Sequence, residues 1–190
     1  MKAKKQLLGL IVVVAVSAAA SPVVAQTTWF STTLSGERVT GDPGDSDGWG
    51  VAAVGVDGGT THYYIWVTDV ATPTVAHIHS GVAGANGGVA IDLDATFAEV
   101  SNNIYVARGA VTGGSTAALL DTPGAFYVNV HNGDHPAGAV RGQVLGDGGA
   151  HSSLAGTLRG SRQVGSGGDP DGDGFGIVTF DDSMAHFYFS

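Results

Sequence analysis

The sequence lacks cysteine altogether, so no disulfide bond can stabilise the fold. Stability has to come from an apolar core, from pairing between strands, or from a bound metal ion. Lysine is also missing after residue 5. Beyond residue 25 only five arginines stand against 17 acidic residues, a net charge of −12; they are Arg38, Arg108, Arg141, Arg159 and Arg162. This balance argues against nucleic acid and anionic membrane surfaces as partners, because both need cationic contacts.

Long apolar runs are absent except at the N-terminus. There Lys2, Lys4 and Lys5 precede the uncharged stretch 7–20, and Val23-Val24-Ala25 offers a small residue for cleavage. A basic start, a short apolar core and a small-residue exit indicate a secretory signal over residues 1–25. The run is short for a membrane span, which needs roughly 20 residues; a retained anchor is the alternative. We therefore expect a secreted, extracytoplasmic protein with no membrane span after the signal is removed.

Glycine is abundant, with 31 residues, and it separates short β-branched and aromatic segments. Only Thr116–Asp121 has a helical pattern. Many short strands bounded by turn residues predict an all-β fold, an antiparallel Greek-key-like β-sandwich over residues 26–145. The predicted strands are Val51–Val56, Tyr63–Val67, Val75–His79, Val89–Leu93, Ile104–Val111, Phe126–His131 and Ala139–Leu145.

The end of the chain repeats the start of this domain. Leu34-Ser35-Gly36 returns as Leu154-Ala155-Gly156, Gly48-Trp49-Gly50 as Gly174-Phe175-Gly176, and His62-Tyr63-Tyr64 as His186-Phe187-Tyr188. We interpret 146–150 as a Gly-rich linker and 151–190 as a partial second repeat. About 40 residues rarely sustain a core alone, so we expect two or three strands lying against the first domain. Self-association through 151–190 is the alternative.

Two segments rich in histidine have the spacing of strands. Side chains alternate along a strand, so His77 and His79 share one face, as do Tyr127, Asn129 and His131. If the two strands are neighbours, the three histidines form a three-nitrogen site, and imidazole suits copper and zinc. The other interpretation is structural: the histidines hydrogen-bond to backbone and to Asn129.

The same segments carry a family resemblance. AHIHSGVAGANG, from Ala76 to Gly87, resembles the first signature of CHRD (chordin-type) domains. FYVNVH, from Phe126 to His131, followed by PAGAVRGQ, from Pro136 to Gln143, resembles the second. The likeness spans about residues 29–145. It implies an immunoglobulin-like or superoxide-dismutase-like β-sandwich in a secreted protein, and no agreed biochemical function. We therefore expect a binding or structural module, not an enzyme, whose partner is an unknown extracellular protein or a cell-surface molecule.

The histidine pattern is also similar to that of copper-zinc superoxide dismutase, where a strand His-x-His and a later strand Val-His supply copper ligands. This likeness implies His77, His79 and His131 as metal ligands, with copper favoured over zinc, and Arg141 near them. No histidine clearly matches the bridging ligand, and the zinc loop is missing. A copper-dependent oxidoreductase is therefore the alternative to a binding module.

Four further histidines are weaker candidates. His135, in the turn after His131, is a candidate fourth ligand, whereas His62 and His186 are expected to be structural and His151 to be solvated. An acidic loop offers a second metal. Its alternating oxygen ligands, Asp169, Asp171 and Asp173, are typical of calcium loops, but the distant bidentate Glu is lacking. Calcium is therefore the less favoured ion, and an ordinary turn is the alternative.

Overall fold

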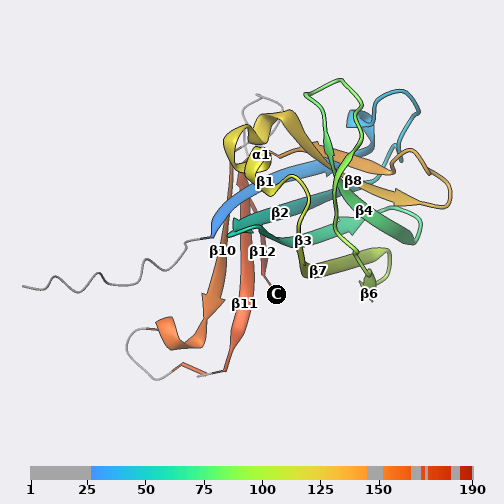
Figure 1. Cartoon of the computed structure of the whole chain (residues 1–190). Helices are drawn as coiled ribbons and strands as arrows, with labels where there is room; N and C mark the ends of the chain where they lie inside the picture. The colour runs from blue at the N-terminus through green and yellow to red at the C-terminus, as the bar shows by residue number, and fades with distance from the viewer. Residues whose placement is uncertain (1–26, 145–151, 164–167, 170, 181–184, 190) are drawn as a thin grey trace, which may run out of the picture.

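The computed structural model describes residues 27–144, 152–163, 168–169, 171–180 and 185–189. Nine strands form one antiparallel sheet in the order β5-β4-β8-β9-β1-β2-β3-β7-β6 (Figure 1). The strands are β1 (Thr28–Ser35), β2 (Trp49–Asp57), β3 (Thr60–Thr68), β4 (Pro73–Ser80), β5 (Val89–Asp92), β6 (Ala98–Ser101), β7 (Ile104–Thr112), β8 (Phe126–Asn132) and β9 (Val140–Gln143). Three short helices, η1 (Gly36–Arg38), α1 (Thr116–Asp121) and η2 (Pro123–Ala125), lie in the connections.

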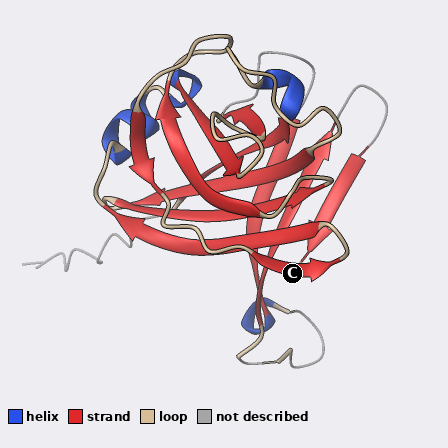
Figure 2. Cartoon of the chain, turned by 90° about the vertical axis from the view of Figure 1, so that its right-hand side faces the viewer, coloured by secondary structure: helices blue, strands red, loops and turns tan. Residues whose placement is uncertain are grey.

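The sheet curls so that its two halves face each other (Figure 2). A single residue pair, Ser35 with Arg141, joins β9 to β1. One apolar cluster joins both halves, with Val54 and Ile65 from β2 and β3 packed together with Ile78 and Val128 from β4 and β8. These four side chains are at most 2% exposed. The predicted all-β fold class is therefore confirmed.

Strand alternation explains which side chains enter the core. In β4 and β8 the paired residues Ile78 and Val128 point inward, whereas His79 and Tyr127, paired one position further, point outward. The seven predicted strands and the helix at 116–121 are all present. Sequence reasoning missed β1, whose TWFSTTLS sequence is rich in Thr and Ser, and β6, whose four residues are all exposed.

A second sheet has three strands, β10 (Ser152–Arg159), β11 (Asp173–Phe180) and β12 (Ala185–Phe189), with helix η3 (Gly160–Arg162) after β10. Ile177 of β11 is fully buried against the outer face of β2 and β3, where it joins Val51, Ala53 and Tyr64 in one cluster. Figure 1 shows β10 and β11 crossing the strands of the first sheet. The expectation that this segment forms strands lying against the first domain is confirmed.

The second sheet reproduces the hydrogen bonding of β1, β2 and β3 at a constant offset of 124 residues. The amide of Gly36 donates to Gly48 O, and the amide of Gly160 donates to Gly172 O. The pair Ser35–Trp49 corresponds to Arg159–Asp173, and Val54–Tyr63 corresponds to Val178–Phe187.

The constant offset corrects two of the three predicted repeat matches. Leu34 corresponds to Leu158, not to Leu154, and Gly48 corresponds to Gly172, not to Gly174. The sequence match had assumed small insertions that the backbone does not contain. The third match, His62 with His186, agrees with the offset of 124 residues.

Two predicted segments lie outside the described residues: the signal at 1–25 and the linker at 146–150. In the described part of the chain, no helix is long and apolar enough to cross a membrane.

Candidate metal centre

The antiparallel pairing of β4 with β8 brings three imidazoles together on the outer face of the sheet. His77 lies opposite Asn129 and His79 opposite Tyr127, while His131 follows two residues further along β8. His77 Nδ1 is 3.2 Å from His131 Nε2. One ring nitrogen from each histidine lies within 4.8 Å of the others. The predicted cluster of His77, His79 and His131 on adjacent strands is thus present.

The outer ring nitrogens of two histidines are held by backbone carbonyls. His79 Nδ1 is 3.0 Å from Gly87 O, and His131 Nδ1 is 2.9 Å from Pro136 O. A carbonyl only accepts hydrogen bonds, so both Nδ1 atoms carry the proton. In the neutral rings each Nε2 is therefore unprotonated and its lone pair is directed at the cluster; that of His79 has no hydrogen-bond partner, whereas that of His131 accepts from Asn129. Metal-bound histidines are oriented in this way, by an outward N–H donated to a carbonyl or carboxylate.

Burial keeps these two rings neutral. The pKa of His79 and that of His131 are both lowered, chiefly because burial disfavours the charged ring. The carbonyl contacts oppose this lowering of the pKa, and proximity to His77 adds a smaller lowering. A histidine binds metal only as the neutral ring. His79 and His131 are therefore available as metal ligands at neutral pH.

His79 Nε2 is the least satisfied atom of the cluster. It is buried and has no hydrogen-bond partner, an arrangement that ordinarily costs about 1–3 kcal/mol. The ring is fixed by stacking on Tyr127, with centroids 5.0 Å apart and planes inclined by 9°. Such a nitrogen, oriented and unpaired, needs a cation or a donor to satisfy it.

His77 has a carboxylate on its outer side. Asp92 of β5 lies opposite His77, and Asp92 Oδ1 is 3.8 Å from His77 Nε2. With its proton on Nδ1, His77 donates to His131 Nε2; with its proton on Nε2, it faces Asp92 and leaves the Nδ1 lone pair free. Moving one proton across this ring thus gives three inward lone pairs. Metal–nitrogen bonds of about 2 Å put ligand nitrogens roughly 3–4 Å apart. The three ring nitrogens, which lie within 4.8 Å of one another, would therefore need to move only slightly closer together to bind one ion.

Glycines place the two carbonyls that hold His79 and His131. A Cβ at Gly87 would collide with the carbonyl of Ser80, so only glycine lets this loop return close to β4. Gly138 has φ of +141° and lies against the side-chain oxygen of Asn129, where any Cβ would clash. Asn129 in turn donates to His131 Nε2, at 3.3 Å. The glycines of both family-like segments are therefore part of the site's support.

Arg141 supports the loop that follows β4. Its guanidinium donates to the carbonyls of Val82 and Ala85 and to the side-chain oxygens of Asn86 and Thr40, at 2.8–3.3 Å. It is 3% exposed, and its Cζ atom lies 3.5 Å from the centroid of the Tyr127 ring. Arg141 thus borders the cluster, as expected, through the ring that stacks on His79. Its hydrogen bonds go to the loop.

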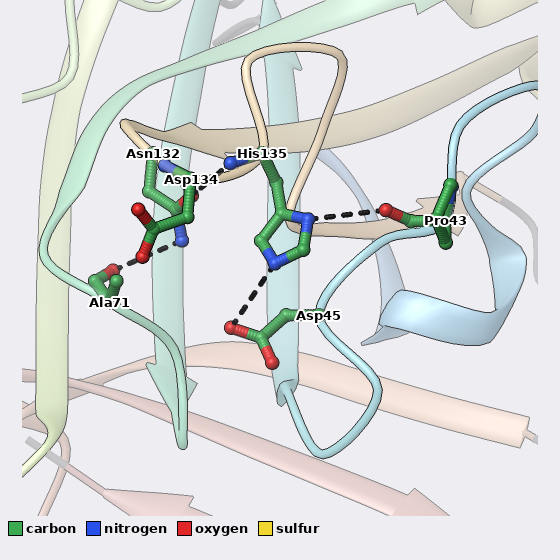
Figure 3. Close-up of polar contacts among 6 residues, drawn as sticks. All are labelled: Pro43, Asp45, Ala71, Asn132, Asp134 and His135. Carbon is green, nitrogen blue, oxygen red and sulfur yellow. Dashed lines mark hydrogen bonds and ion pairs between the residues drawn. The ribbon is translucent and has the colours of Figure 1, made fainter.

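His135, a candidate fourth ligand in the sequence, is not part of the cluster and instead contacts the loop between β1 and β2 (Figure 3). Its Nδ1 donates to Pro43 O at 3.1 Å, and its Nε2 is 3.9 Å from Asp45 Oδ2. Burial raises the pKa of Asp45. Asn132 Oδ1 accepts from the amide of His135 at 2.7 Å, which sets the turn. His135 therefore ties the loop carrying Pro136 to the loop between β1 and β2.

The remaining candidates lie elsewhere. His62 of β3 packs near Trp29, with ring centroids 6.3 Å apart. His151 and the side chain of His186 are outside the described residues. In the acidic loop, Asp169 and Asp171 are exposed, while the side chain of Asp173 is not described. Calcium binding there stays a prediction.

Sequence reasoning missed the support of the cluster. Asp92 is exposed, and the pairing of β5 with β4 that puts it opposite His77 was not part of the prediction. No sequence signal identifies Gly87 O and Pro136 O, because every residue has a carbonyl and only loop geometry directs one of them to a ring nitrogen.

Together, these features define a curled β-sandwich with a three-imidazole cluster outside the core. The family model of the CHRD domain matches residues 30–144, more than half of the chain. The chain therefore belongs to the CHRD family, whose domains are non-enzymatic modules found in extracellular proteins. No curated protein matches the chain. No solved structure matches it either.

Proposed function

We propose that the chain is a secreted CHRD module that binds one transition-metal ion through His77, His79 and His131. The observation that carries the proposal is the buried, unpartnered His79 Nε2, directed at two further imidazoles. The outward contacts with Gly87 O, Pro136 O and Asp92 support the same assignment. Nitrogen ligands alone favour copper over zinc, by the general order of divalent affinities.

The surroundings of Arg141 favour a binding module over a copper-dependent oxidoreductase. A dismutase needs a cationic group to attract its anionic substrate. Arg141 is 3% exposed and donates to loop oxygens, and residues 26–190 carry a net charge of −12. In a binding module, the bound metal ion would stabilise the fold, or the module would present the ion to a partner.

Adding copper is expected to raise the melting temperature of the metal-free protein until one ion is bound per chain. Binding to the native state alone adds about 2.7 kcal/mol when free ion exceeds the dissociation constant 100-fold, or roughly 5–10 °C for a protein of this size. Zinc should give a smaller rise. Calorimetric melts at increasing copper, with His62→Ala as the matched control, measure this.

A melting temperature unchanged by copper and zinc near neutral pH would return the three histidines to a structural role. Superoxide removal by the copper-loaded protein, far above that of copper bound to an unrelated protein and lost in His79→Ala, would instead establish the oxidoreductase.

A further inference from the structure

The described surroundings of the histidine cluster offer an ion three ring nitrogens and no oxygen. Asp92 Oδ1 is 3.8 Å from His77 Nε2, the outer nitrogen of that ring, so this carboxylate lies on the far side of the ligand. Asn129 directs an N–H group at His131 Nε2, and the same amide nitrogen donates to Ala137 O at 3.0 Å, which fixes the orientation of the amide. Among the described residues, the group that could hold an ion consists of three histidines without a carboxylate.

One side of the cluster is closed to solvent. His79 Nε2 and Asn129 Oδ1 are both buried and have no hydrogen-bond partner. The ring of Tyr127 covers one face of His79, while the Tyr127 hydroxyl accepts from the amide of Gly87. Water therefore does not reach this side. An ion that needs a fourth ligand would have to take it from the other side, past His77, whose side chain is 20% exposed.

A buried positive charge lies behind one of the ligands. Strand β8 runs between β4 and β9, so the Tyr127 ring is flanked by His79 on one side and by Arg141 on the other. Arg141 is 3% exposed, so solvent screens its charge only weakly. The pKa of His79 is lowered chiefly by burial, and the charge of Arg141 adds to the lowering. The same repulsion acts on a bound ion, and twice as strongly on a divalent ion as on a monovalent one.

We propose that the cluster binds copper as Cu(I) in preference to Cu(II). The inference rests on the proposed function, because the ligands are the same three histidines. Cu(II) usually takes tetragonal sites of nitrogen and oxygen ligands, which the cluster does not provide. Cu(I) has a filled d shell, so the d electrons impose no geometry and three nitrogens suffice. Its single charge is also repelled less by Arg141. Asp92 has the opposite effect, but its side chain is 72% exposed and its charge is screened by solvent.

Competition with chelators specific for each oxidation state tests this preference on the whole chain. The Cu(I) affinity is measured against bicinchoninate without oxygen, with ascorbate supplying the electron that reduces Cu(II). The Cu(II) affinity is measured against a chromophoric chelator without reductant. We expect a dissociation constant for Cu(I) at least tenfold below that for Cu(II), which raises the one-electron potential by about 59 mV relative to free copper ions. His62→Ala, at an imidazole outside the cluster, should keep both affinities.

A redox titration gives an independent measurement. The EPR signal of Cu(II) is followed as the potential is lowered, for copper bound to the protein and for copper in excess imidazole. Both samples offer imidazole nitrogens, but only the protein limits their number to three and adds the buried charge of Arg141. The protein-bound copper is therefore expected to be reduced at the higher potential.

The outcomes separate this inference from the metal centre itself. Equal or tighter binding of Cu(II), or a midpoint potential at or below that of copper in imidazole, would overturn the preference for Cu(I) and leave the three-histidine site intact. Failure of both oxidation states to bind would overturn the proposed function as well.

Discussion

Replacing His79 with alanine is expected to lower the affinity for copper at least about 100-fold while the protein remains folded. The substitution removes the buried Nε2 atom that has no other partner, and two imidazoles bind an ion far less tightly than three. Competition with a chromophoric chelator measures the affinity. His62→Ala, at an imidazole outside the cluster, should bind copper like the wild type. Equal losses in the two variants would show that the effect is not specific to the site.

The same variant should also change how stability depends on pH. The pKa of His79 is lower in the folded protein than its ordinary value near 6.5, so the unfolded chain takes up the proton first. Without metal, the wild type should lose stability as pH falls below about 6.5, towards the folded-state pKa. His79→Ala lacks this contribution, so its stability should depend less on pH between pH 7 and 5. Some dependence should remain, because the pKa of His131 is also lowered in the folded protein.

Replacing Ile177 with aspartate is expected to detach the second sheet from the first domain. Ile177 is 0% exposed in an apolar cluster with Val51, Ala53 and Tyr64. A carboxylate there would lie unpaired among apolar side chains, a change that costs several kcal/mol. This exceeds what a small docked sheet can supply, so detachment is expected in preference to burial of the charge.

Tryptophan fluorescence reports on this docking directly. The chain has three tryptophans, and Trp29, Trp49 and Trp66 all pack around the cluster that contains Ile177. Ile177→Asp should therefore shift the emission to longer wavelength and increase the binding of a hydrophobic dye. Val100→Asp serves as the control. Unchanged emission in Ile177→Asp would mean that the second sheet does not cover this face.

The histidine cluster could be predicted because strand geometry has a fixed period. Alternation of side chains placed His77 and His79 on one face of β4, and Asn129 and His131 on one face of β8. Pairing of β4 with β8 then brings the three histidines together. The direction of His135 could not be predicted in the same way, since it depends on a turn set by Asn132 and on Pro43, 92 residues away in the sequence.

The second sheet shows a different limit of sequence reasoning. Apolar segments indicated strands, but tripeptide matches placed Leu154 where the backbone register places Leu158. Glycine-rich motifs recur too often to fix a register, whereas hydrogen bonds fix it residue by residue. Which face of the sheet is buried also depends on docking, which the repeat alone does not determine.

X-ray absorption of the copper-loaded wild type, after dialysis against a weak chelator, tests the central claim most directly. We expect one copper ion per chain, with nitrogen neighbours at about 2 Å and the outer-shell scattering of three imidazoles. Loss of all copper on dialysis, or copper retained with at most one imidazole, would contradict the assignment of His77, His79 and His131 as a metal centre.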